Sequence, residues 1–245
     1  MGFAEIMSIS DNIARVEEQI GAACRAANRS RDSVQLMAVS KTHPPELILE
    51  AYAAGLRLFG ENRIQEYAGK QPALLAAGIL SGEPPASFHC IGPVQSNKAA
   101  RAVQLFDAIE TVDSLRLAER LDRAASETAK TLPVFVEIKL SPEASKHGLA
   151  PDSAELAQLL ERLPDLTHLQ PRGWMTVPPY AEDPEQTRTY FRQLRTLRDS
   201  LAQRHPGLSL DELSMGMSHD FPVAIEEGAT VVRVGTAIFG ARPVK

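Results

Sequence analysis

The 245-residue chain lacks the features that mark several classes of protein. It has two cysteines, Cys24 and Cys90, whose wide separation fits neither a metal site nor a disulfide-built secreted protein. Its net charge of −5 and pI near 5.7 disfavour nucleic acid or an anionic membrane as the main partner. No apolar run approaches the roughly 18 residues of a membrane span, and the start lacks a signal-peptide pattern. We therefore predict a cytoplasmic protein with no nucleic-acid or membrane partner.

Two further absences concern the fold. No Pro-, Gly- or Ser-rich linker divides the chain. No glycine-rich phosphate loop follows the first predicted strand, which disfavours a nucleotide-binding Rossmann unit. The chain does contain 44% hydrophobic residues, enough to bury a large core as one domain. We accordingly expect residues 1–245 to form a single domain.

Short apolar runs alternate with helical patterns along the chain. An amphipathic helix is expected over residues 8–28, before the first strand. Eight strands are then predicted at Val34–Ser40, Leu56–Gly60, Phe88–Val94, Ala108–Val112, Pro133–Leu140, Leu169–Val177, Glu212–Met217 and Val231–Gly235. Helical patterns between strands are clearest at Leu115–Ala129, Ser153–Leu163 and Pro184–Arg204. This alternation predicts an α/β fold, and eight units favour a single (β/α)₈ TIM barrel with an additional N-terminal helix over a doubly wound open sheet.

Lys41 stands at the end of the first predicted strand, in the run VQLMAVSKTHPP (Val34–Pro45). The residues before it are apolar, as in central strands of parallel sheets, so Lys41 is expected at the rim of the core, where barrels place their active sites. Burial lowers the pKa of a lysine and leaves part of the amine neutral and able to attack a carbonyl. A strand-end lysine can instead extend to water along its own stem.

The ends of the last two predicted strands supply groups that can bind an anion. Phosphate sites in such barrels use the loops after strands seven and eight, where backbone N–H groups face the anion. Gly235 and Thr236 offer bare backbone and a hydroxyl there, and Ser214, Gly216 and Ser218 can add donors from the neighbouring strand end. The alternative is that the glycines only permit tight turns and close packing.

A nucleophilic lysine facing a phosphate cradle suggests a phosphorylated aldehyde bound as an imine, and pyridoxal 5'-phosphate meets that description. Arg233 lies two residues before Gly235, and so on the same strand face. Its guanidinium would donate to an unprotonated pyridine nitrogen, because arginine cannot accept a proton. The competing interpretation is an ion pair inside the barrel with a glutamate such as Glu61.

Five segments resemble those of the pyridoxal phosphate homeostasis proteins (the YggS/PROSC family), whose fold is similar to the barrel domain of alanine racemase: AVSKTHP, FGENRIQEY, HCIGPVQSNK, SKHGL and LSMGMSHDFPVAIEEGATVVRVGTAIFGAR. The resemblance runs from about Ser33 to Arg242. It implies pyridoxal phosphate on Lys41, the phosphate near Ser214, Gly235 and Thr236, Arg233 at the pyridine nitrogen, and Asn62 of the GEN motif close to the cofactor. No metal is expected.

Some positions depart from the family pattern. Cys90 stands for a phenylalanine, Lys139 for an asparagine and Trp174 for a leucine, and none of these removes a cofactor contact named above. The roles of His89, Lys139 and Lys146 stay open. His89 can pack on the cofactor ring, act as an acid or base, or be hydrogen-bonded in the core, whereas Lys139 and Lys146 are expected to be solvated.

The resemblance implies intracellular homeostasis of pyridoxal phosphate, in which a Lys41 imine holds the cofactor for delivery to apoenzymes. A monomer or weak dimer is expected. Racemisation needs an acid/base group on each face of the substrate, and alanine racemases take the opposing tyrosine from a second domain. The chain ends at Lys245, shortly after the eighth strand, so we expect no established catalysis. A single-domain pyridoxal-phosphate-dependent amino-acid racemase is the alternative, and a cofactor-free Schiff-base aldolase a third hypothesis.

Overall fold

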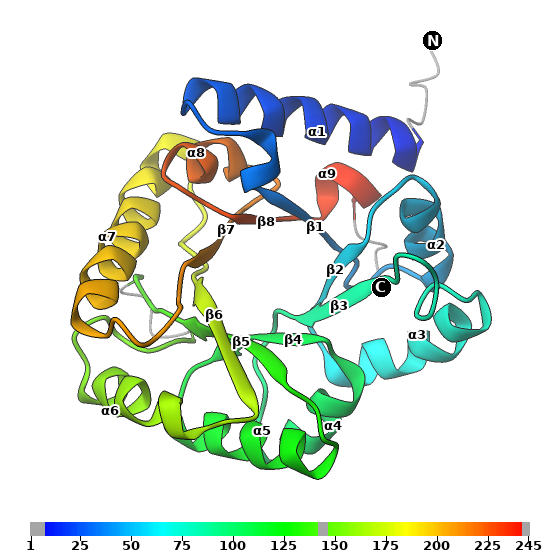
Figure 1. Cartoon of the computed structure of the whole chain (residues 1–245). Coiled ribbons are helices and arrows are strands. Elements are labelled where there is room, and N and C mark those ends of the chain that lie inside the picture. Colours follow the sequence, from blue (N-terminus) through cyan, green and yellow to red (C-terminus); the bar gives the residue numbers. More distant parts are fainter. Residues whose placement is uncertain (1–7, 142–146, 242–245) are drawn as a thin grey trace.

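The computed structural model describes residues 8–141 and 147–241. Within them, parallel strands form a closed barrel in which each strand pairs with its sequence neighbour and β8 pairs with β1 (Figure 1). The strands are β1 Gln35–Val39, β2 Leu58–Glu61, β3 Ser87–Cys90, β4 Ala108–Val112, β5 Leu132–Glu137, β6 Leu169–Met175, β7 Glu212–Met217 and β8 Val231–Val234. The predicted α/β barrel is confirmed.

The α-helices surround the barrel as a ring (Figure 1). They are α1 Ile9–Ala26, α2 Pro45–Ala53, α3 Ile64–Ala76, α4 Ala99–Leu105, α5 Leu115–Glu127, α6 Ala154–Arg162, α7 Arg188–Arg204, α8 Phe221–Glu226 and α9 Thr236–Phe239. Short 3₁₀ turns lie at η1 Arg31–Ser33, η2 Ser96–Lys98, η3 Leu163–Asp165 and η4 Pro184–Thr187. None of the helices in the described ranges is long and apolar enough to cross a membrane.

The strands are buried on both faces because helices cover the outside and side chains fill the inside. Met37 and Ala38, which point to opposite faces of β1, are both fully buried. The interior is tightly packed at this level, since a Cβ added to Gly60 would lie 2.7 Å from the sulfur of Met37 and 3.0 Å from Ile91 Cδ1. A glycine in β2 therefore makes room for the methionine of β1.

The N-terminal helix α1 completes the outer ring. Within the described residues, β8 is followed only by the four-residue helix α9. Helix α1 lies across this side of the barrel between α8 and α2 (Figure 1), and buries Ile13, Val16 and Ile20. Asn12 of α1 donates from Nδ2 to the Ile238 carbonyl of α9 at 3.0 Å. The segment before the first strand thus covers β8 and β1 and holds the turn that follows β8.

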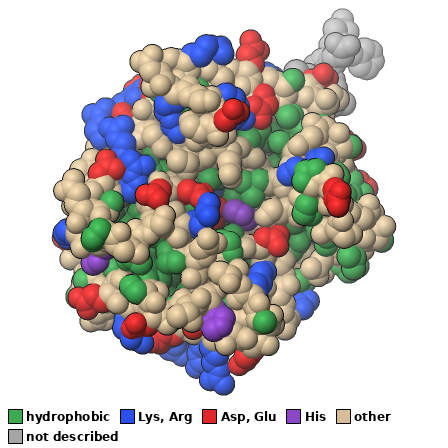
Figure 2. All heavy atoms as spheres, viewed as in Figure 1, with side chains coloured by type: hydrophobic (Ala, Val, Ile, Leu, Met, Phe, Trp, Pro, Cys, Tyr) green, Lys and Arg blue, Asp and Glu red, His purple; other side chains and the backbone are tan. Residues whose placement is uncertain are grey.

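Basic side chains gather on the outer surface over α7 and α8, at the upper left of Figure 2. Three of them share one carboxylate: Arg188, Arg192 and Arg195 pair with Glu227 at 3.2, 2.8 and 3.2 Å. The Glu227 side chain is 5% exposed. This cluster ties α7 to the end of α8 and is separate from the barrel interior.

Candidate functional site

Lys41 lies two residues after the end of β1, at the carboxyl end of the barrel. It is half-buried and comes after Ser40, which is fully buried. The next residue, Thr42, has a φ of +69°, in the left-handed region that residues with a side chain rarely adopt. Its backbone N–H donates to Glu66 of α3 at 2.5 Å. The chain therefore turns sharply after Lys41, and α3 stabilises the turn.

Strand register places Asn62 on one side of Lys41. Val39 pairs with Gly60, so Lys41 and Asn62, each two residues further along, follow the ends of neighbouring strands. The backbone of Asn62 lies so close to the β3 side that a Cβ added to Gly92 would be 2.0 Å from its carbonyl oxygen. Glycine at position 92 thus lets the chain after β3 approach Asn62.

The end of β8 lies on the other side of Lys41. Ala38 pairs with Val234, so the next position in register brings Val39 to Gly235. The packing of Gly235 against Val39 agrees with this register, because a Cβ added to Gly235 would lie 3.3 Å from the Val39 carbonyl oxygen. Lys41 therefore follows a strand that lies between β2, which leads to Asn62, and β8, which leads to the Gly235 turn.

Two backbone amides converge at the start of α9. The N–H groups of Gly235 and Ala237 both donate to the Ser218 hydroxyl oxygen, at 3.1 and 3.5 Å. Thr236 lies between them and is exposed. Backbone N–H groups that converge on one oxygen form the kind of concavity that binds oxyanions. The ends of β7 and β8 therefore provide an anion cradle at the same end of the barrel as Lys41.

Arg233 lies inside the barrel, two residues below this turn, and is 4% exposed. One terminal nitrogen donates to the Ser214 hydroxyl and the other to the Thr176 carbonyl, both at 2.8 Å. Burial lowers the pKa of Arg233, while the carboxylates of Glu110 and Glu137 oppose that effect. An arginine stays charged in proteins, so a fixed cation lies beneath the site.

Glu110 of β4 is the buried carboxylate that lies close to Arg233. The residue is fully buried, accepts a hydrogen bond from the Ser214 hydroxyl at 2.5 Å and lies 2.8 Å from His89 Nδ1. Burial raises the pKa of Glu110, but the hydrogen bond and charge of His89 and the charge of Arg233 hold it below its usual range. Glu110 is therefore ionised inside the barrel at neutral pH.

A second lysine lies beneath the Lys41 turn. Lys70 of α3 is 7% exposed, and its amine donates to the Ser40 carbonyl at 3.0 Å and to Glu61 at 2.7 Å. Lys70 also pairs with Glu66 at 2.8 Å. Glu61 is fully buried; burial raises its pKa, and Lys70 only partly opposes the rise. This buried pair holds α3 against the end of β1.

The sequence matches the alanine racemase N-terminal domain family over residues 12–243. The pyridoxal phosphate homeostasis protein of Aquifex aeolicus is 41% identical over 236 residues, which make up 96% of this chain and 99% of that relative. The chain belongs to the pyridoxal phosphate homeostasis protein family. The protein of this name from Escherichia coli K12 is 40% identical, with 96% of this chain and 97% of that relative covered. The resemblance found in the sequence is confirmed.

Solved structures agree with this membership in the pyridoxal phosphate homeostasis protein family. PipY of Synechococcus elongatus PCC7942, solved with PLP bound, has a TM-score of 0.83 and is 44% identical, covering 95% of this chain and 100% of that one. An alanine racemase of Clostridium difficile 630 has a TM-score of 0.67 at 14% identity. This chain covers 58% of that racemase, and the likeness shows a common fold alone.

The structure brings most of the predicted site residues of this family member to one end of the barrel. Lys41, Asn62, Gly235 and Thr236 lie at the strand ends, with Arg233 below them. Their contacts with the cofactor stay predictions. The ion pair considered between Arg233 and Glu61 is not formed, because Glu61 binds Lys70 and Ser40 whereas Arg233 lies beside Glu110 and Glu137.

Ser214 and Ser218 occupy different levels. Ser214 is fully buried between Glu110 and Arg233, whereas Ser218 meets the amides of the anion cradle. The predicted phosphate contact of Ser214 stays a prediction, and Ser218 lies in the better place for that role. Sequence reasoning missed Glu110, although a charged residue within the apolar strand Ala108–Val112 was a visible signal. Lys146 lies outside the described residues, and Lys139 is half-exposed.

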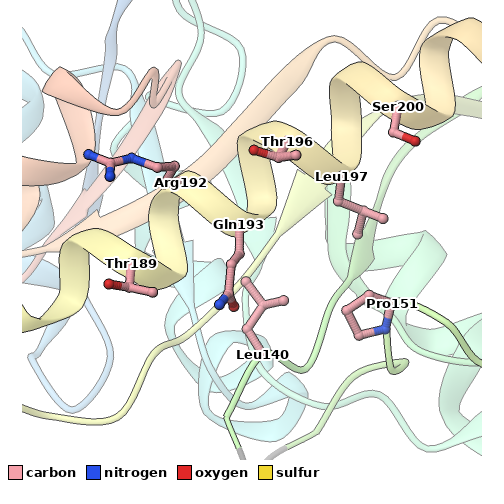
Figure 3. A pocket seen from close by; sticks show the side chains of 8 residues that line it. All are labelled: Leu140, Pro151, Thr189, Arg192, Gln193, Thr196, Leu197 and Ser200. Carbon is pink, nitrogen blue, oxygen red and sulfur yellow. The ribbon is translucent and has the colours of Figure 1, made fainter.

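A groove of 540 Å³ lies on the outside of the barrel, along α7 (Figure 3). Thr189, Gln193, Leu197 and other α7 residues line it together with Leu140 and Pro151. It contains none of the predicted cofactor residues and is not part of the site. Within the described ranges, no cluster of His, Cys, Asp or Glu could hold a metal ion.

Proposed function

We propose that this protein binds pyridoxal 5'-phosphate on Lys41 and serves cofactor homeostasis by storing the aldehyde and releasing it to apoenzymes in the cytoplasm. The observation that carries the proposal is the amide cradle at Gly235 and Ala237, which lies at the same end of the barrel as Lys41. Family membership supports it, because the related PipY has been solved with PLP bound. A lysine and an anion cradle at one end of the barrel suit one phosphorylated aldehyde.

The donor set fits this cofactor. The Lys41 amine would join the aldehyde carbon with release of one water, and the Gly235 and Ala237 amides with the Thr236 hydroxyl would hold the phosphate. Arg233 would donate to the ring nitrogen, since its guanidinium has no acceptor. When bound, the cofactor supplies an electrophilic aldehyde on an electron-withdrawing ring. Asn62, after the neighbouring strand β2, would complete the rim close to the cofactor.

Replacing Thr236 with valine is expected to weaken binding of pyridoxal 5'-phosphate about 10- to 100-fold, because a hydrogen bond to a charged group contributes about 1.5 to 3 kcal/mol. Valine has the same shape, and Thr236 is exposed, so the fold should be unaffected. Titration of imine absorbance gives both dissociation constants. Pyridoxal, which lacks the phosphate, serves as the control and should bind the variant and the parent protein alike. Equal affinity of the two proteins for the phosphorylated aldehyde would contradict the phosphate assignment.

Two assays on the protein loaded with pyridoxal phosphate distinguish storage of the cofactor from catalysis. As a carrier, it should restore the activity of an apoenzyme even when a phosphatase destroys free pyridoxal phosphate. As a racemase, it should instead convert L-alanine or L-serine to the D-enantiomer. A racemase needs a group such as a tyrosine on the second face, and two of the four tyrosines of the chain are engaged elsewhere: Tyr67 stacks on Phe88, and the Tyr52 hydroxyl donates to the Pro84 carbonyl. Steady formation of D-amino acid would contradict the carrier function and show that the protein is a racemase.

A further inference from the structure

The barrel interior contains a buried carboxylate, Glu110, that the proposed function leaves unused. It lies on β4 and is fully buried at the centre of a polar chain that reaches β3, β7 and β8. We propose that Glu110 is a positioning residue that fixes Arg233 and His89 for the ring of the bound cofactor. This assignment rests on the proposed function, because it presumes a cofactor held on Lys41.

The direction of each hydrogen bond in the chain follows from the chemistry of its members. A guanidinium only donates and a carboxylate only accepts. The Ser214 hydroxyl, which lies 2.8 Å from Arg233 and 2.5 Å from Glu110, must therefore accept from the arginine and donate to the glutamate. The charge on Glu110 polarises the hydroxyl and makes it a stronger acceptor. Glu110 thus acts on Arg233 through Ser214.

The guanidinium is held at both terminal nitrogens. The nitrogen that does not meet Ser214 donates to the Thr176 carbonyl at 2.8 Å. Two fixed acceptors define the plane of a guanidinium, so the direction in which Arg233 faces a ligand is set before the ligand arrives. Loss of Glu110 would leave one of these acceptors free to rotate.

The second oxygen of Glu110 fixes His89. Nδ1 of the imidazole lies 2.8 Å from Glu110 Oε1, and the side chain is 15% exposed. Across the described residues no hydrogen-bond partner meets Nε2. His89 pairs in register with Gly60, two positions below Asn62 on the same strand face. Because Glu110 holds Nδ1, the Nε2 end of the imidazole points away from Glu110. His89 lies at the level just below Lys41.

Stability alone gives little reason for this network. Barrel interiors are filled mainly by branched apolar side chains, and replacing a buried ion pair with apolar residues is often neutral or stabilising. A carboxylate that bridges a serine and a histidine, and through the serine an arginine, instead resembles the supporting contacts that orient ligand-binding groups. The network is therefore assigned to the cofactor site.

Glu110→Gln tests the assignment, with Glu227→Gln as the matched control. Each substitution removes one buried carboxylate, and Glu227 lies in the outer cluster with Arg188, Arg192 and Arg195. Both variants should have a lower Tm. Only Glu110→Gln should shift the absorption maximum of the imine and weaken binding about tenfold, the lower end of what supporting contacts of a ligand site contribute. It should weaken pyridoxal and pyridoxal 5'-phosphate by the same factor, because Arg233 and His89 are positioned for the ring.

Ser214→Ala gives a second test that does not alter the buried charge. If Ser214 transmits the effect of Glu110, both aldehydes should lose affinity equally; if only pyridoxal 5'-phosphate is weakened, Ser214 holds the phosphate and the assignment is wrong. A Glu110→Gln protein with a lower Tm but the parent spectrum and affinities would also overturn it. A parent protein that forms no imine with either aldehyde would overturn the proposed function itself.

Discussion

Replacing Lys41 with alanine is expected to abolish covalent attachment of pyridoxal phosphate. Borohydride reduction makes the imine permanent, so the parent protein should gain the mass of the reduced cofactor on the peptide that contains Lys41. The variant should gain none, because an imine requires an amine at the place where the aldehyde is held. Mass spectrometry of the intact protein and of its peptides measures both outcomes.

Lys139→Ala is the matched control for this experiment. Lys139 follows β5, is half-exposed and lies outside the predicted set of cofactor residues. Its removal should leave the labelling of Lys41 complete. Labelling of the Lys41→Ala protein at another lysine, with the parent stoichiometry, would show that a different amine holds the cofactor and would contradict the proposed site.

Local patterns predicted the barrel because each strand has its own apolar run. The fourth and seventh predicted strands, Ala108–Val112 and Glu212–Met217, match the observed strands at both ends. The fifth strand was predicted to reach Leu140 but ends at Glu137, because Ile138 forms an isolated bridge with Leu149. Pairing with a segment that returns after a loop is tertiary information, which a local hydrophobic pattern does not contain.

The part of the site that depends on where the strands end was predictable from the sequence. Lys41, Asn62 and Gly235 lie at one rim because parallel strands end there, and β1 pairs with both β2 and β8. The interior polar pairs were not predictable. The hydrogen bond from Ser214 to Glu110 joins positions 104 residues apart. It forms only because the two side chains point into the barrel at the same height along its axis. The apolar run Ala108–Val112 contains Glu110, but nothing in the sequence indicates the partner of this carboxylate.

Replacing Lys70 with methionine should destabilise the protein by about 3 to 5 kcal/mol at pH 7, the range for removing one partner of a buried ion pair. Methionine fills similar space but leaves Glu61, which is fully buried, without the amine 2.7 Å away. The Ser40 carbonyl, next to Lys41, loses its donor as well. Denaturant unfolding followed by circular dichroism gives the free energy of unfolding of both proteins.

The loss of stability caused by Lys70→Met should become smaller as the pH falls. Burial already raises the pKa of Glu61 while Lys70 opposes the rise, so removing Lys70 raises that pKa further. A carboxyl group whose pKa is higher in the folded than in the unfolded state contributes stability that is present below the unfolded pKa and is lost as pH rises through the folded pKa. The Lys70→Met protein should therefore be closest to the parent in acid and fall furthest below it near neutrality.

A second substitution separates the contact of Lys70 with Glu61 from its contacts with the Ser40 carbonyl and Glu66. Lys70→Met with Glu61→Gln removes both charges, and replacing both members of a buried pair is often close to neutral, so most of the lost stability should return and its pH dependence should disappear. If the double variant stays as unstable as Lys70→Met, then the contacts of Lys70 with the Ser40 carbonyl and Glu66, rather than the charge of Glu61, account for the loss. In that case Lys70 acts chiefly on the turn that carries Lys41, and the pH dependence expected for the single variant should also be absent.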